Sequence, residues 1–133
     1  MSEDHSYLRH SSDSLCDIGL HPSRIDVRVF PGSLDEDQVR RIVARVQNMA
    51  GNNRYPVLVL PDKNTRISFF GLRVLASEEA MNYATATAYI IRSFHHQVMA
   101  EALFSMYNLS KPVQVFKEEP PALNWLQTFG PGL

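Results

Sequence analysis

The chain has 133 residues, which is the size of one domain. Hydrophobic residues make up 44% of it and charged residues 20%, a balance that excludes wholesale disorder. The 13 Lys and Arg residues against 14 Asp and Glu residues give a net charge of −1, which argues against a nucleic-acid-binding protein. The single cysteine excludes an internal disulfide and a metal site built from several cysteines.

The N-terminal segment is polar. We expect a flexible tail over residues 1–14, followed by one domain over residues 15–133. The segment has no apolar stretch of the kind that a signal peptide carries. No apolar run in the chain approaches the roughly 20 residues of a membrane-spanning helix. We therefore expect a cytoplasmic protein without a transmembrane segment, in which Cys16 stays reduced.

Two segments of alternating apolar and polar residues open the domain. Residues 16–20 and 25–29 each place their apolar side chains on one face, and Pro22 lies in the break between them. This pattern predicts an antiparallel hairpin whose other face, with Asp26, is solvated. Cys16 falls on the apolar face, so we expect a buried structural thiol rather than a nucleophile.

Residues 34–50 have the strongest helical pattern. Their apolar side chains recur every three or four positions, and Gly51 follows where the helix should end. Ser33 and Glu36 have the spacing of a capping box. The helix also carries Arg40, Arg41 and Arg45. We expect these arginines on a solvated face, and a surface that docks an anionic partner is the alternative.

Residues 55–60 are apolar on both faces, which predicts a strand buried at the centre of a parallel sheet. A helix is expected over residues 68–81. Residues 85–91, with β-branched and aromatic side chains, predict another strand.

Ser93 is placed to cap the next helix, which ends before Pro112. Its predicted core stripe consists of Val98, Met99, Ala102, Leu103 and Met106. Residues 113–116 predict a short strand. Pro120 and Pro121 suit the first turn of a last helix.

The predicted order of elements is ββαβαβαβα. Strands separated by helices form right-handed parallel crossovers, and the opening hairpin adds an antiparallel strand at one edge. The sequence therefore predicts an α/β domain with a mixed, mostly parallel five-stranded sheet and about four helices.

This order resembles that of STAS domains, the fold of the anti-sigma-factor antagonists, from about Leu15 to Phe129. STAS domains carry a segment Asp-Ser-Ser-Gly-Leu-Gly-Val after the central strand, and its second Ser is phosphorylated. Residues 68–74 read Ser-Phe-Phe-Gly-Leu-Arg-Val at the corresponding place. The chain is also similar to small stand-alone bacterial STAS-like proteins of unassigned function, which are related to the CRAL–TRIO lipid-transfer fold.

The resemblance fails at the phosphorylation site. Phe70 stands where the acceptor Ser should be, and Ser68 stands where the Asp should be. A phenyl ring cannot accept phosphate, so the kinase-driven switch of the family is not expected at that position. Ser68 or Thr65 could substitute as an acceptor, and the simpler interpretation is that Ser68 caps the helix.

The sequence offers no catalytic set. His95 and His96 are adjacent, so on a helix they point about 100° apart and do not chelate a metal together. A nucleophile elbow, a phosphate-binding loop and a dinucleotide fingerprint are all absent. We therefore expect no catalytic residue, no metal and no cofactor.

The best site argument is topological, because open α/β sheets bind ligands beyond the carboxyl ends of their strands. Six polar residues of this sequence follow two successive strands: Asp62, Thr65, Arg66, Ser68, Arg92 and Ser93. With two arginines and two helix N-termini they form a candidate anion-binding site. Ordinary polar loops are the alternative.

Two functions fit these patterns. The first is a non-catalytic regulatory or protein-interaction module that forms a homodimer. Its candidate interaction surface consists of Phe69, Phe70, Arg73 and Tyr107. The alternative is a carrier of a small apolar or lipid-like ligand, which the CRAL–TRIO relationship and the apolar helices suggest.

Overall fold

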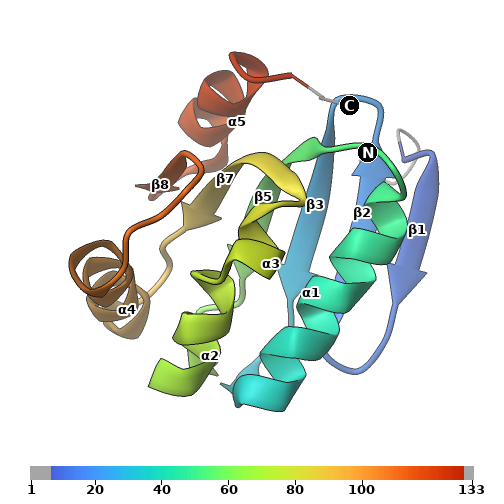
Figure 1. The fold of residues 1–133 in the computed structure, drawn as a ribbon. Coiled ribbons are helices and arrows are strands. Elements are labelled where there is room, and N and C mark those ends of the chain that lie inside the picture. Colours follow the sequence, from blue (N-terminus) through green and yellow to red (C-terminus); the bar gives the residue numbers. More distant parts are fainter. Residues whose placement is uncertain (1–6, 131–133) are drawn as a thin grey trace.

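The computed structural model describes residues 7–130 (Figure 1). A mixed six-stranded sheet lies at its centre, with the strand order β1-β2-β3-β5-β7-β8. The strands are β1 (Arg9–Ser12), β2 (Cys16–His21), β3 (Arg24–Val29), β5 (Tyr55–Pro61), β7 (Ala84–Ile90) and β8 (Val113–Phe116). The pairs from β3 to β8 are parallel, and β2 is antiparallel to both of its neighbours, β1 and β3.

Helices cover both faces of the sheet. The helices are α1 (Glu36–Ala50), α2 (Phe69–Leu75), α3 (Glu78–Met81), α4 (Phe94–Met106) and α5 (Glu119–Gln127). Helix α5 packs on one face, and α1, α2 and α4 pack on the other. A separate two-stranded parallel sheet joins β4 (Gly32–Leu34) to β6 (Thr65–Ile67). The predicted α/β class with a mostly parallel mixed sheet is thus confirmed, whereas the predicted counts of strands and helices are too low.

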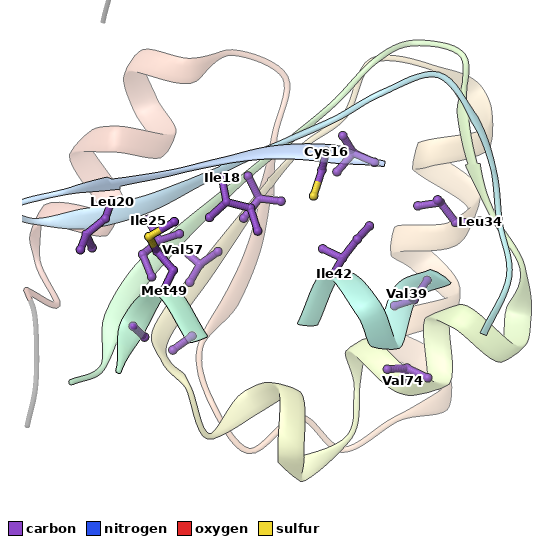
Figure 2. Packing of buried hydrophobic residues seen from close by; sticks show 14 residues of the cluster. Cys16, Ile18, Leu20, Ile25, Leu34, Val39, Ile42, Met49, Val57 and Val74 are labelled. Carbon is purple, nitrogen blue, oxygen red and sulfur yellow. The ribbon is translucent and has the colours of Figure 1, made fainter. Parts of the chain in front are cut away.

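The core between α1 and the sheet follows the predicted alternation. Figure 2 shows Cys16 and Ile18 of β2 on the side of the sheet that carries Val39 and Ile42 of α1. Cys16 is buried, as predicted. This burial is the main reason why the pKa of its thiol is raised to about 11. A thiol with such a pKa stays protonated and unreactive at neutral pH.

The polar N-terminal segment contributes an edge strand. The sequence predicts a tail over residues 1–14, but β1 pairs with β2, with Arg9 opposite Leu20 and Ser12 opposite Asp17. All four side chains of β1 are exposed, so backbone hydrogen bonds hold the strand and no hydrophobic alternation reveals it. Residues 1–6 of the predicted tail lie outside the described residues.

Arg45 ties this segment to α1 and is not on the solvated face where we expected it. Its Nη1 lies 2.8 Å from Asp13 Oδ1 and donates to the Cys16 carbonyl at 3.2 Å. Asp13 also accepts a hydrogen bond of 2.7 Å from the Leu15 amide. Although burial opposes ionisation of Asp13, the amides of Leu15 and Cys16 hold the pKa of its carboxyl below the usual value.

The predicted solvated face of the hairpin is covered at Asp26. The Tyr7 hydroxyl donates to Asp26 Oδ2 at 2.6 Å, and Arg24 Nε donates to Oδ1 at 2.7 Å. The Tyr7 ring lies over Gly19, where an added Cβ would come within 2.6 Å of it. Asp26 is therefore buried with two partners.

The ends of α1 and α2 differ from the predicted ones. The capping box of α1 is formed by Asp35 and Gln38 rather than Ser33 and Glu36, because residues 32–34 pair with β6 as strand β4. The predicted helix over residues 68–81 is two helices, since Ser77 caps α3 at the Ala80 amide. Strands β4 and β6 have three residues each, too few for a periodic pattern.

Candidate ligand-binding cavity

The floor of the candidate site is a row of side chains across the sheet. Val27 of β3 pairs with Val59 of β5, Val59 with Tyr89 of β7, and Tyr89 with Val115 of β8. All four residues line one cavity. Successive strand residues point to opposite faces, so the neighbours Leu58 and Ala88 pack against α5 instead.

The roof is formed by three helices. Apolar side chains of α1, α2 and α4 face the row on the sheet, because each helix places apolar residues at intervals of three or four positions. The roof residues include Val39, Val43, Val46, Leu72, Leu75, Met99 and Leu103. The three helices border apolar space between themselves and the sheet.

This space is a cavity of about 180 Å³. A cavity of roughly 150 Å³ lined by Leu, Ile and Phe in another protein stays dry and binds benzene or xenon. The exposed fractions of the floor side chains agree with open space above them, since Val59 and Tyr89 are only half-buried under the helices. Their neighbours on the opposite face, Leu58 and Ala88, are 1% and 0% exposed. The cavity thus has room for a small ring compound.

Two hydroxyl groups interrupt the apolar floor. Thr87 and Tyr89 lie two residues apart on β7 and both line the cavity. Neither hydroxyl forms a hydrogen bond with another described residue. Every fully buried side-chain nitrogen or oxygen in residues 7–130 has a partner, so the oxygens of these two hydroxyls are not fully buried. Burial raises the pKa of Tyr89, which keeps its hydroxyl protonated.

His95 and His96 join α4 to β6 at one end of the cavity. The Ile67 amide donates to His95 Nε2 at 3.2 Å. The Arg92 amide donates to His96 Nδ1 at 3.0 Å, so His96 Nε2 carries the proton and donates to the Thr65 carbonyl at 2.9 Å. Both rings are therefore neutral in this arrangement. Sequence reasoning excluded joint chelation by these histidines but did not anticipate that they bind the backbone of β6.

The pKa of His95 is lowered. Burial is the main cause, and the charge of Arg66 acts in the same direction. The hydrogen bond from the Ile67 amide needs a ring nitrogen without a proton. Acid therefore works against this contact between α4 and β6.

The predicted anion site lies at the carboxyl edge of the sheet, and most of its polar groups have partners within the chain. Ser68 accepts from the Gly71 amide and caps α2 as predicted, and Ser93 caps α4 by accepting from the His96 amide. The Thr65 hydroxyl donates to the carbonyls of Val29 and Phe30.

The remaining three residues of that site behave differently from one another. Asp62 accepts from the Asn64 amide at 2.9 Å, and Arg92 lies 3.6 Å from Glu119. Arg66 is exposed and lines the cavity. The anion site stays a prediction.

The exposed apolar side chains extend over α4 and do not include Tyr107, which was predicted for the interaction surface. Phe69 and Phe70 are exposed, whereas Tyr107 is partly buried against Leu72 and Met99. Val98 and Met106, predicted for the core, are exposed, while Met99 and Leu103 are buried as predicted. Helix α4 is apolar on all sides, so its periodicity did not reveal which side faces the core. We define the α2–α4 surface by its exposed residues Phe69, Phe70, Phe94, Val98, Phe104 and Met106.

Arg73 belongs to the rim of the α2–α4 surface. Its guanidinium lies over the Phe70 ring, 5.4 Å from the ring centre, and 3.5 Å from the Glu36 carboxylate. The position that resembles a phosphoacceptor therefore carries an exposed aromatic ring beside a cation.

No three His, Cys, Asp or Glu residues within 7–130 lie close enough together to hold a metal ion. Over the same residues, none of the helices is both long enough and apolar enough to span a membrane.

Comparison with known proteins identifies a family. The model of a family described as "Domain of unknown function (DUF7793)" matches residues 27–130. The matched range includes every described residue that lines the cavity and leaves out β1 and β2. No curated protein and no solved structure matches the chain. The chain belongs to the DUF7793 family.

Proposed function

We propose that this domain is a non-catalytic binding module that takes up a small apolar ligand in the cavity under α1, α2 and α4. The observation that carries the proposal is the cavity itself, about 180 Å³ of space with a mostly apolar lining. The side chains around this space lack contact partners on one side, and a bound apolar ligand would supply those contacts.

The resemblance to STAS-like and CRAL–TRIO proteins supports the same proposal. The elements from β2 to α5 follow the order that the resemblance implies, with β4, β6 and α3 in addition. Of the two functions that the sequence suggests, the ligand carrier has the more specific structural support. The cytoplasm is the compartment that we propose for it.

Thermal unfolding of the full chain with small apolar compounds tests this function. Benzene, toluene and indene at saturating concentration should raise the melting temperature, because a ligand that binds only the folded state stabilises it by about 2.7 kcal/mol at 100 times its Kd. Val59→Phe should abolish the shift by filling the cavity, while the matched variant Val98→Phe, on the exposed side of α4, should retain it. A wild-type protein that none of these compounds stabilises would contradict the proposal.

A second candidate function is self-association through the α2–α4 surface, which the six exposed apolar residues favour. We propose a second copy of the chain as the partner, because a net charge of −1 produces little repulsion between copies. Sedimentation velocity at micromolar concentration should show a dimer. Phe70→Ser combined with Phe94→Ser should yield the monomer, and Leu8→Ser, which removes an exposed apolar side chain elsewhere, should not. A wild-type monomer would exclude this candidate.

A further inference from the structure

We propose that the ligand of this cavity is a mostly apolar ring compound with one uncharged hydrogen-bonding group, and that this group binds the hydroxyls of Thr87 and Tyr89. The inference rests on the proposed function and specifies its ligand class. The hydroxyls are placed by the chain itself, since Thr87 and Tyr89 are two residues apart on β7 and therefore point to the same face.

Of the two hydroxyls, that of Thr87 is supported by the stronger evidence. Its side chain is only 8% exposed, and its hydroxyl has no partner among the described residues. The other two buried polar side chains in residues 7–130 do have partners, as Thr65 donates to two carbonyls and Asp26 binds Tyr7 and Arg24. This hydroxyl is not sealed off, because every fully buried side-chain nitrogen or oxygen in residues 7–130 has a partner. A ligand group in the cavity can therefore pair with the Thr87 hydroxyl.

The neighbouring strand shows what a purely apolar floor looks like. The residues paired with Thr87 and Tyr89 are Val57 and Val59 of β5, and both line the same cavity. Valine has nearly the shape of threonine, with a methyl group in place of the hydroxyl. The hydroxyl at position 87 is therefore not needed to fill space, and it adds a hydrogen-bonding group in the middle of the floor.

The same surroundings argue for an uncharged group on the ligand. The side chains beside the two hydroxyls, Val57, Val59 and Val115, are apolar, and an ion placed among them would lose its hydration without a counter-charge. Among the described residues that line the cavity, the guanidinium is that of Arg66, an exposed residue of β6. An alcohol, phenol, ketone or amide suits the floor better than a carboxylate does.

Three compounds of similar shape test this assignment by titration of the full chain, followed by NMR. They are p-xylene, p-cresol and p-toluate, which carry a methyl, a hydroxyl and a carboxylate at the same place. We expect wild-type protein to prefer p-cresol over p-xylene and to bind p-toluate most weakly. A hydrogen bond contributes about 0.5–1.5 kcal/mol, so each of Thr87→Val and Tyr89→Phe should reduce the preference for p-cresol about 2- to 12-fold.

Two internal controls keep the test independent of folding. The affinity for p-xylene should change little in both variants, because they remove a hydroxyl and preserve the shape of the cavity. Thr85→Val should leave the preference unchanged, since the Thr85 hydroxyl donates to the Gly130 carbonyl and does not line the cavity.

The outcomes separate the two proposals. If p-xylene binds but the preference for p-cresol is the same in wild type and in the double variant Thr87→Val/Tyr89→Phe, the hydroxyl assignment is wrong and the proposed function stands. Tighter binding of p-toluate than of p-cresol also overturns the assignment, in favour of a charged group near Arg66. If none of the three compounds binds, both proposals fail.

Discussion

On one face of the central sheet, α5 packs directly on β5 and β7, and on the other face a cavity separates the same strands from α1, α2 and α4. The α5 face is built from small and fully buried residues, such as Ala86, Ala88 and Ala122, which let the helix approach closely. On the cavity face Val59 and Tyr89 remain half-buried. The comparison shows that the space is a property of one layer and not of the whole domain.

The arrangement of the helices explains the difference. Helix α1 forms one core with β2 and β3 that also takes in Val57, Val74 and Ala84, and α4 forms a second core with α2. Helices α1 and α4 lie on either side of α2 and α3 (Figure 1). The middle of the face, over β5 and β7, is therefore covered by the edges of several helices instead of by one. Helix α5 covers the opposite face with a single stripe that includes Ala122 and Leu126.

The largest expected effect is from truncating a leucine on each face. Leu126→Ala, in the close-packed α5 layer, should lower the free energy of unfolding by about 2–5 kcal/mol, because the new space cannot close. Leu75→Ala, at the cavity, should lower it by less than half as much, since Leu75 is partly buried and already borders open space. Urea denaturation of both variants measures the difference. Equal losses would mean that the two layers are packed alike.

Adding methyl groups should act in opposite directions on the two faces. Ala88→Val should destabilise the protein by about 1–3 kcal/mol, because Ala88 has no space around it. Val59→Ile should stabilise it by about 0.5–2 kcal/mol by filling part of the cavity. Chemical denaturation monitored by the fluorescence of the single tryptophan, Trp125, would measure both effects. Destabilisation by Val59→Ile as large as that by Ala88→Val would contradict the comparison.

Acid should weaken the cavity face through His95. The pKa of His95 in the folded chain is below its ordinary value of about 6.5, so the unfolded chain binds more protons between these two pKa values. The contribution of His95 to stability is therefore complete above about pH 6.5 and is lost as the pH falls through the folded pKa. The measured free energy of unfolding should therefore decrease as the pH is lowered from 7.5 to 5.

A glutamine at this position supplies the control. His95→Gln keeps an oxygen that accepts from the Ile67 amide and does not titrate, so its stability should vary less with pH than that of the wild type. His21, in the turn between β2 and β3, has a lowered pKa of the same sign, chiefly from burial, and remains in both proteins. An identical pH dependence of wild type and His95→Gln would show that the contact of α4 with β6 does not respond to pH.

The strong periodic patterns predicted the central elements well. The alternation in β2 and β3, the apolar run of β5 and the helical repeat of α1 each have many residues that report one face. Three-residue strands such as β4 and β6 have too few residues for that signal, and β1 is a polar edge strand held by its backbone. Helix α4 has apolar residues on every side, so its exposed Phe94, 82% accessible, looked no different from its core residues.

The cavity could not be predicted from the sequence because periodicity tells which face a residue points to, and not whether the facing layer reaches it. Thr87 and Tyr89 stood out only as residues that favour strands. Their meaning depends on the absence of a partner in residues 7–130, which only the packed structure reveals. At the carboxyl edge of the sheet, the predictions that Ser68 and Ser93 cap helices are confirmed.

Xenon is the most direct probe of the central claim, because it enters dry apolar cavities and needs no specific ligand chemistry. The measurement is a crystal structure of the full chain equilibrated under xenon gas. We predict xenon in contact with Val59 of β5 and Tyr89 of β7, under α1 and α4, and none between α5 and the sheet. A structure in which the helices close on Val59 and Tyr89 and xenon is absent from that layer would contradict the account.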